Sequence, residues 1–382
     1  MPSPLHITHA VLSLDVGGLE RIVISLIRSA RQRGHRVSVV CVERPGTLAV
    51  EAEKEGATVL SLGKPTGRHP EFVQRAARAL TELKPDVVHT HQIGAAWYLG
   101  QAARGLGIAP VLHTEHGNEF ARYTGWWKNL KIRLFLLQAA RLVERFCCVS
   151  EEIAGAVTKW RTVPRAKVEV VPNGIPTGPT PNELSPASVR AAQGIPEGAL
   201  VIGTVGRMAE VKRQDLLLRA VAELRQTVPN VHALLVGDGD QRAKLQKLAG
   251  ELVIADRVHF AGYQASPEHY LRAMDVFALT SRSEGFPVSL LEAWLAGLPT
   301  VCSAVGGIPT IVTHDVNGLL FPSGDEGALV KSLLRVLNDS DTRIRLGRAG
   351  NQVVHERYSL DRMATEYETR YRSLIAASRE PR

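Results

Sequence analysis

The sequence predicts an α/β protein with two domains, each built on a parallel, doubly wound sheet. Short apolar runs, typical of buried strands, alternate along the chain with segments of helical periodicity. The alternation stops once, in a segment rich in Pro, Ser, Thr and Asn over 177–197, and then restarts. We interpret this segment as a linker. A length of 382 residues also suits two domains better than one.

Composition limits the classes of partner. The chain is 45% hydrophobic and 22% charged, as in a globular protein that folds in water. Its formal net charge of +8 favours anionic partners, namely phosphates, a membrane surface or nucleic acid. Nucleic acid is the weakest of these, because no spacing resembles a zinc finger or an aromatic–basic RNA motif.

Cysteine usage and the N-terminus bear on the compartment. None of Cys41, Cys147, Cys148 and Cys302 forms a C-x-x-C pair, and all lie in apolar runs, so we expect buried, reduced thiols. The first residues, 1–5, lack a charged leader region, and no apolar run reaches the length of a membrane span. We expect a cytoplasmic protein.

The first domain is predicted to begin with a strand at 5–12, a helix at 19–33 and a strand at 37–42. Between the first two lies Asp15-Val16-Gly17-Gly18, whose glycines either permit a turn or let the backbone approach a ligand. The motif lacks the full G-x-G-x-x-G fingerprint, which counts against a dinucleotide coenzyme. The later elements of this half are a helix at 70–83 and strands at 86–89, 110–113, 146–149 and 168–171.

Four histidines, His89, His91, His113 and His116, follow or end predicted strands. A zinc site is one interpretation, but the histidines come from at least two strands and no E-x-x-H helix accompanies them. Ligand binding or structural hydrogen bonds fit better. His116 precedes Gly117 at a strand's carboxyl end, where open α/β sheets bind ligands.

The segment 123–145 combines a leucine-rich helix with aromatic and basic residues. Those near its start are Trp126, Trp127, Lys128, Lys131 and Arg133. The segment is either a core helix with a basic exposed end or a contact with a membrane surface, because tryptophan and lysine favour lipid interfaces.

The second domain is predicted from strands at 200–205, 231–236, 257–262, 275–280 and 299–303. A helix should follow Glu210, with Lys212 in its first turn. Asp238-Gly239-Asp240 resembles a D-x-D metal motif, but it stands between a strand and a helix, where an aspartate commonly caps the helix. We therefore expect a helix cap there and no metal site.

The stretch from Ser283 to Glu292 joins a strand, a glycine turn and a helix that ends before Gly297. Pro287 suits the first helical turn, and the free N–H groups of Val288, Ser289 and Leu290 would form an anion site. Glu284 and Glu292 flank that site. Acids in these two positions suit a ligand that carries hydroxyls on both sides of a phosphate. They could instead be a capping acid and a solvated residue. A glycosidase acid pair is disfavoured, because a wholly helical span would separate the two by about 12 Å.

Two cations, Arg207 and Lys212, fall at a strand–helix junction of the second domain. Left unpaired they would repel each other, and a diphosphate would neutralise both. Alternatively, both are solvated and pair with Glu210 and Asp215.

Taken in order, these motifs resemble the family 4 retaining glycosyltransferases of the GT-B fold. They are Asp15-Val16-Gly17-Gly18, His116-Gly117, Val149-Ser150, Pro172-Asn173-Gly174, Gly206-Arg207 with Lys212, Val236-Gly237-Asp238-Gly239, and 283–287 through Glu292. Each motif alone is weak, but the ordered set covers nearly the whole chain.

The resemblance implies two Rossmann-like domains facing across a cleft. The first, 1–178 with a returning helix at 357–382, would bind the acceptor, and the second, 179–356, a nucleotide-diphosphate sugar. By similarity, Arg207 and Lys212 hold the diphosphate, Glu292 binds ribose and Glu284 lies near hydroxyls of the donor sugar. The other expected donor contacts are Gly17, Gly18, Gly206, Gly237, Gly285, Phe286, Pro287, Val288 and Ser289, with His116 near the sugar.

The family transfers with retention and needs neither a metal nor a cofactor besides its co-substrate. Departure of a nucleotide diphosphate builds negative charge, which Arg207, Lys212 and a helix N-terminus can stabilise without Mg²⁺. By resemblance, the acceptor is a glycan or lipid-linked hydroxyl in polysaccharide or glycolipid biosynthesis. The basic charge of the chain and the aromatic and basic residues near Trp126 lead to the further hypothesis that the first domain works at the cytoplasmic membrane face. The alternatives are an epimerase or phosphorylase on the same fold, and a catalytically silent nucleotide-sugar-binding protein.

Overall fold

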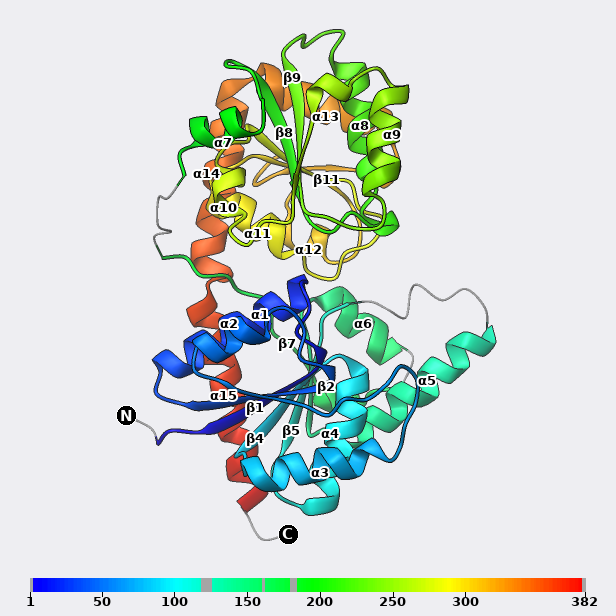
Figure 1. The fold of residues 1–382 in the computed structure, drawn as a ribbon, viewed down its shortest axis with the longest axis vertical. Coiled ribbons are helices and arrows are strands. Elements are labelled where there is room, and N and C mark those ends of the chain that lie inside the picture. The colour runs from blue at the N-terminus through cyan, green and yellow to red at the C-terminus, as the bar shows by residue number, and fades with distance from the viewer. Residues whose placement is uncertain (1–2, 118–125, 160–161, 179–183, 380–382) are drawn as a thin grey trace. The chain divides into compact units, whose positions relative to one another are not determined.

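The structure is a computed structural model that describes residues 3–117, 126–159, 162–178 and 184–379. The chain divides into two compact units, each built on one parallel sheet (Figure 1). Unit 1 contains Met1–Pro176 and Leu360–Arg382, and unit 2 contains Thr177–Ser359. The predicted α/β class with two doubly wound sheets is confirmed.

Unit 1 has a seven-stranded sheet in the order β3-β2-β1-β4-β5-β6-β7. Its strands are β1 (His6–Ser13), β2 (Arg36–Arg44), β3 (Thr58–Ser61), β4 (Val87–His91), β5 (Val111–Glu115), β6 (Arg145–Cys148) and β7 (Val168–Val170). Its helices are α1 (Gly18–Gln32), α2 (Ala49–Lys54), α3 (Phe72–Leu83), α4 (Ile93–Leu106), α5 (Trp126–Arg141), α6 (Glu151–Lys159), the 3₁₀ turn η2 (Arg165–Lys167) and α15 (Leu360–Arg379). The strand order reverses between β1 and β4, which is where sheets of this kind bind ligands.

The C-terminal helix α15 belongs to unit 1. It packs beside α1 against the sheet (Figure 1). The hydroxyl of Tyr371 on this helix lies 2.6 Å from Nδ1 of His89 on β4. Helices α3, α4 and α5 form a second group that packs together. The four cysteines are buried free thiols, as predicted.

Unit 2 has a six-stranded sheet in the order β10-β9-β8-β11-β12-β13. Its strands are β8 (Leu200–Val205), β9 (Val231–Val236), β10 (Val258–Gly262), β11 (Val276–Leu279), β12 (Thr300–Ser303) and β13 (Leu319–Phe321). Its helices are α7 (Pro186–Ala192), α8 (Gln214–Leu224), α9 (Arg242–Glu251), α10 (Glu268–Leu271), α11 (Val288–Leu295), α12 (Ile308–Ile311), α13 (Glu326–Asn338) and α14 (Ser340–Arg357), with the 3₁₀ turns η3 (Glu210–Lys212) and η4 (Ala255–Arg257). Helix α8 packs with both α9 and α13, while α11 packs on α14.

Three predictions about local structure were wrong. The segment 177–197 is not linker throughout, because α7 begins at Pro186 with Ser185 accepting a hydrogen bond from the N–H of Ser188. Serine followed by proline is itself a helix-start signal, which the linker interpretation overlooked. Lys212 does not lie in the first turn of α8, because it ends the 3₁₀ turn η3 and Arg213 then takes a left-handed conformation.

The third correction concerns Asp238-Gly239-Asp240. Helix α9 begins only at Arg242, with Gln241 before it and no side-chain cap. Asp238 instead accepts a hydrogen bond from the N–H of Gly239 and pairs with Arg242 at 3.1 Å. The aspartates therefore shape the turn after β9 without capping the helix.

Candidate functional site

The first candidate site lies at the carboxyl edge of the unit 2 sheet and is called here the charged edge, formed by Arg207, Lys212 and Glu284. The Nζ of Lys212 lies 2.7 and 2.9 Å from the two carboxylate oxygens of Glu284. The hydroxyl of Ser281 also donates to Glu284, at 2.5 Å. Glu284 is buried at 7% exposure, so this carboxylate is a fixed, desolvated charge with three hydrogen bonds.

Backbone contacts hold the two partners of this ion pair in place. The hydroxyl of Thr280, at the end of β11, donates to the carbonyls of Lys212 and Arg213 at 3.1 and 2.8 Å. The N–H of Gly307 donates to the carbonyl of Glu284 at 3.1 Å. A Cβ on Gly306, which has a φ of +55°, would stand 1.8 Å from that same carbonyl oxygen. Any side chain at position 306 would therefore displace the backbone of Glu284.

The two cations of the charged edge differ in their surroundings. Lys212 is neutralised by Glu284, whereas Arg207 is exposed and makes no ion pair within the described parts of the chain. The pairing considered from the sequence, with Glu210 and Asp215, is wrong, because those acids pair with Arg282 and Arg213. Arg207 is thus a cation available to an anionic ligand.

The glycine turns after β8 and β9 pack directly against each other. Gly237 has a φ of +134°, and a Cβ there would stand 2.1 Å from the carbonyl oxygen of Gly206. Gly206 itself has a φ of +153° and open space around its own Cβ position. The pair therefore brings bare backbone to the sheet edge from which Arg207 projects.

The turn from β11 into α11 places the other predicted donor contacts. Helix α11 begins at Val288, with Pro287 as its N-cap. The N–H of Leu290 donates to the carbonyl of Pro287 at 3.2 Å, so the predicted three-amide anion site is reduced to Val288 and Ser289. Gly285 is half-buried, and Phe286 is buried with its ring edge-on to Tyr358, so only its backbone can face a ligand.

Glu292 lies one turn into α11 and is half-buried. Glu284 precedes this helix without capping it, which excludes the interpretation of Glu284 as a capping acid.

The glycine turn of unit 1 begins α1. Gly17 is the N-cap with extended backbone, and a Cβ there would stand 2.2 Å from a carboxylate oxygen of Glu20. Gly18 is the first helical residue, and its Cβ position opens into free space. At position 18, the absence of a side chain leaves room for a ligand. The backbone angle there is not unusual.

The second candidate site, at the carboxyl edge of the unit 1 sheet, is a chain of three imidazoles called here the histidine row. Nδ1 of His9 lies 3.0 Å from Nε2 of His91, and Nδ1 of His91 lies 3.0 Å from Nε2 of His116. The three residues come from β1, β4 and the end of β5, which are adjacent strands. The sequence interpretation grouped His91 with His116 but missed His9, because a single histidine inside an apolar strand carries no local signal.

The other two predicted histidines have hydrogen bonds of their own. His89 contacts the hydroxyls of Tyr371 and Thr114, at 2.6 and 2.8 Å. His113 contacts the hydroxyl of Thr90 at 3.0 Å. The structural hydrogen bonds expected for these histidines are therefore present.

Burial keeps the histidine row uncharged. Desolvation lowers the pKa of His9 to about 4. Desolvation, with a smaller contribution from His113, lowers the pKa of His116 to about 3, and it holds the pKa of His91 well below 6.5. At neutral pH each imidazole thus carries one N–H donor and one bare acceptor.

Metal ligation was the alternative interpretation of the histidines. One nitrogen each of His9, His89 and His91 lies within 4.8 Å of the others. However, both nitrogens of His89 are already hydrogen-bonded, and both nitrogens of His91 contact neighbouring imidazoles. These nitrogens are therefore engaged within the protein, so the geometry favours hydrogen bonding.

The proposed membrane contact falls largely outside the described side chains. The backbone of α5 is described from Trp126, but the side chains of Trp126, Trp127, Lys128 and Lys131 are not. Arg133 is exposed, as are Leu130 and Leu134, at 39% and 51%. Among the described helices, none combines the length and the apolar character needed to cross a bilayer.

Comparison with solved structures identifies the fold of this protein. HepE of Anabaena in complex with UDP and glucose superposes with a TM-score of 0.84 at 21% identity, over 97% of this chain and 100% of that one. A glycosyltransferase from Rickettsia africae gives 0.83 at 18% identity, over 98% and 99%. The two doubly wound sheets are thus those of the GT-B glycosyltransferases.

The family follows from sequence comparison. The model for glycosyltransferase family 4 matches residues 16–178, and that for glycosyl transferases group 1 matches residues 187–353. A D-inositol 3-phosphate glycosyltransferase from Stackebrandtia nassauensis is 30% identical over 87% of this chain and 81% of its own length. The lipopolysaccharide core biosynthesis glycosyltransferase LpsD of Rhizobium meliloti is 28% identical over 90% and 91%. The chain belongs to the family 4 glycosyltransferases, as its motifs predicted.

Proposed function

We propose that this protein moves a sugar, with retention of configuration, from a UDP- or GDP-linked donor to a hydroxyl of a glycan or lipid-linked acceptor. The charged edge is the observation that carries the proposal. Arg207 is an exposed cation that forms no ion pair with any residue whose placement is described, and Lys212 is held beside the buried Glu284. This arrangement suits a ligand that carries phosphate oxygens and neighbouring sugar hydroxyls.

In the proposed chemistry, the positive charges are in position before the donor reacts. Departure of the nucleotide leaves negative charge on the diphosphate, which Arg207, Lys212 and the N–H groups of Val288 and Ser289 would stabilise. Glu284 would accept hydrogen bonds from hydroxyls of the donor sugar, and Glu292 from ribose. HepE of Anabaena, whose structures contain UDP, glucose or UDP-glucose, supports a donor of this class.

A donor panel tests this function. The full chain is incubated with UDP- and GDP-sugars, with and without a glycan or lipid-linked acceptor, and free UDP or GDP is measured. Acceptor-dependent release from one donor is the expected result. Release that requires inorganic phosphate, or interconversion of the sugar without release, would support the phosphorylase or epimerase alternative. Binding without turnover by any donor would support the silent alternative.

Retention of configuration has a direct readout. The coupling constant of the anomeric proton in the product is expected to match that of the donor, because the family resemblance implies a retaining enzyme. An inverted anomeric centre in the first-formed product would overturn the assignment.

The acceptor is proposed to lie at the cytoplasmic face of a membrane. The observation in favour is that Leu130, Arg133 and Leu134 are exposed on the basic helix α5 of unit 1. Basic residues near an anionic surface contribute about 1 kcal/mol each, and the contribution falls with salt. Flotation with anionic vesicles should show salt-sensitive binding that Lys128→Glu/Lys131→Glu weakens. A wild-type protein that stays unbound at low salt would exclude this contact.

A further inference from the structure

Helices α11 and α14 of unit 2 pack in close backbone contact. A Cβ on Gly347 of α14 would stand 2.1 Å from the carbonyl oxygen of Gly297, which directly follows α11. One turn later, the side-chain amide of Asn351 donates to the carbonyl of Leu295 at 2.9 Å. Later positions on α14 thus face earlier positions on α11, so the end of α14 lies toward the turn that begins α11.

An aromatic contact joins the end of α14 to that turn. Tyr358 directly follows α14, and its ring lies edge-on to the ring of Phe286, with centroids 5.3 Å apart. Both side chains are buried, at 4% and 7% exposure. Rings in contact inside a close-packed interior cannot move independently. The position of Phe286 therefore depends on that of Tyr358.

Phe286 belongs to residues 285–289, called here the donor turn, whose backbone is proposed to face the nucleotide. On one side of the turn, the N–H of Gly307 donates to the carbonyl of Glu284 at 3.1 Å. On the other side, the N–H of Leu290 donates to the carbonyl of Pro287 at 3.2 Å. Between these two hydrogen bonds, the buried ring of Phe286 anchors the donor turn in unit 2.

Tyr358 also stands next to the point where the chain returns to unit 1. Helix α15 begins two residues later, at Leu360, whose N–H donates to the carbonyl of Ile175 at 2.8 Å. Ile175 lies just before the first passage of the chain from unit 1 to unit 2, at 176–177. This hydrogen bond therefore ties the chain's exit from unit 1 to its return.

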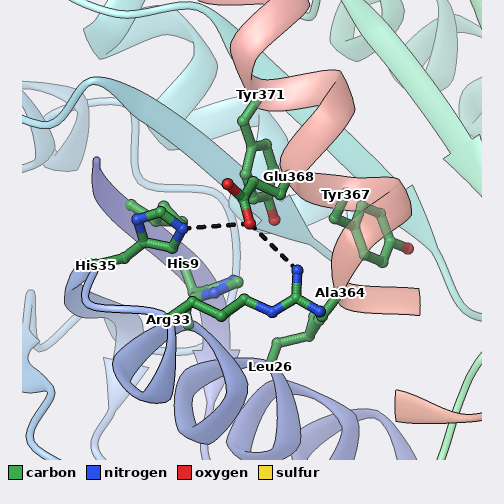
Figure 2. A pocket seen from close by; sticks show the side chains of 10 residues that line it. His9, Leu26, Arg33, His35, Ala364, Tyr367, Glu368 and Tyr371 are labelled. Carbon is green, nitrogen blue, oxygen red and sulfur yellow. Dashed lines mark hydrogen bonds and ion pairs between the residues drawn. The ribbon is translucent and has the colours of Figure 1, made fainter. Parts of the chain in front are cut away.

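Helix α15 is itself fixed to unit 1. Arg33, which follows α1, lies 3.2 Å from the carboxylate of Glu368 on α15 (Figure 2). The same guanidinium lies 2.5 Å from Asp361 in the first turn of α15. Because α14 is held in unit 2 and α15 in unit 1, a change of direction between the two helices falls on Tyr358 and Ser359.

We propose that Tyr358 is a positioning residue that holds the donor turn and couples nucleotide binding there to the return of the chain into unit 1. A nucleotide that orders the donor turn restrains Phe286, and through it Tyr358 and the neighbouring Leu360. The coupling is reciprocal, so a change at this connection also alters the affinity of the donor turn. The nucleotide as ligand rests on the proposed function, whereas the contact of Tyr358 with the donor turn does not.

Amide hydrogen exchange of the full chain, resolved by residue, tests the positioning without any ligand. The amides of Gly307 and Leu290 report on the donor turn, because their hydrogen bonds close it. Tyr358→Leu should speed their exchange about 2- to 10-fold, the factor that an edge-to-face aromatic pair contributes. The matched control is Leu224→Ala, which truncates a buried side chain at the end of α8, a helix that packs with α9 and α13. This control should leave both rates at the wild-type value.

Nucleotide titration tests the coupling, with UDP and GDP added separately. In the wild type, binding of either nucleotide should slow the exchange of the Leu360 amide. In Tyr358→Leu, the Kd should rise about 2- to 10-fold and Leu360 should no longer respond, whereas Leu224→Ala keeps both properties. Phe286→Leu/Tyr358→Leu should bind no more weakly than the weaker single variant, because both substitutions remove the same contact.

Two results would overturn the proposal. One is a folded Tyr358→Leu variant in which Gly307 and Leu290 exchange as in the wild type. The other is a bound nucleotide that leaves the exchange of Leu360 unchanged in the wild type. If Tyr358→Leu does not fold, Phe286→Leu removes the same ring contact from the other side and takes its place. If the wild type binds neither UDP nor GDP, the proposed function fails, and exchange without ligand still decides the role of Tyr358.

Discussion

The charged edge of unit 2 and the histidine row of unit 1 occupy equivalent places in two sheets of similar topology, yet their chemistry is opposite. At the charged edge, a buried carboxylate is paired with a lysine, and an exposed arginine stands beside them. In the histidine row, desolvation removes charge altogether, because the pKa of His9 falls to about 4 and that of His116 to about 3.

This difference indicates a division of roles. Fixed opposite charges suit a ligand that is itself charged, such as a diphosphate. Neutral imidazoles with one donor and one acceptor suit hydroxyl groups, whose position they can select without attracting anions. The same fold thus supports both roles, because a ligand site depends on the side chains at the strand ends and not on the sheet.

The largest expected effect is at Lys212. Lys212→Ala should lower kcat about 10²- to 10³-fold, by analogy with loss of an oxyanion donor. It should also lower the free energy of unfolding by about 1 to 3 kcal/mol, because it leaves the Glu284 carboxylate buried without its cation. Lys212→Met/Glu284→Gln should recover the stability but not the activity. Urea denaturation and initial rates measure the two effects, with Lys247→Ala as an exposed-lysine control.

Arg207→Ala separates catalysis from stability. A similar loss of about 10²-fold or more in kcat is expected, because the guanidinium is proposed to stabilise the leaving diphosphate. The free energy of unfolding should stay within about 0.5 kcal/mol of wild type, since Arg207 is exposed. A variant with normal turnover would remove Arg207 from the site, and a destabilised one would reveal a structural role.

The apolar strand runs made the fold predictable, whereas the pairings within the sites were not. Runs such as 5–12 and 231–236 determine strands locally, and both appear in the structure. The partner of Lys212 lies 72 positions away, and the pairing exists only because β8 and β11 are neighbours in the sheet. The histidine row likewise exists only because its strands are neighbours in the sheet. The sequence does not show which strands are neighbours, so the sequence interpretation considered zinc and overlooked His9.

Acid should weaken unit 1 more than unit 2. The pKa of His9 is lowered in the folded state, so the unfolded chain takes up a proton first as the pH falls below about 6.5, and stability is lost until the pH reaches about 4. Each such histidine contributes a slope of about 1.4 kcal/mol per pH unit within its window. His232 and His259 of unit 2 share the direction of the shift but are less deeply buried.

Hydrogen exchange can measure the acid response of each unit separately in the intact chain. Between pH 7 and 5, protection of β1 and β4 amides, corrected for intrinsic exchange rates, should fall more than that of β8 and β9 amides. His9→Asn should reduce the pH dependence in β1 while leaving that of β8 unchanged. Equal loss of protection in both sheets would show that the neutral histidines do not control the acid response.

The smallest expected effect is that of a chelator, which should leave turnover unchanged. Arg207 and Lys212 already supply positive charge where a diphosphate would need it, and Asp238 is engaged by Gly239 and Arg242. Among the three clustered histidines His9, His89 and His91, both ring nitrogens of His89 and of His91 already take part in hydrogen bonds. Initial rates after dialysis against EDTA, followed by separate additions of Mg²⁺, Mn²⁺ and Zn²⁺, check this.

Recovery by Mg²⁺ or Mn²⁺ after a loss would show that the charged edge is incomplete without a cation. Recovery by Zn²⁺ alone, abolished in His89→Asn, would instead identify His9, His89 and His91 as ligands and end the contrast between the two edges.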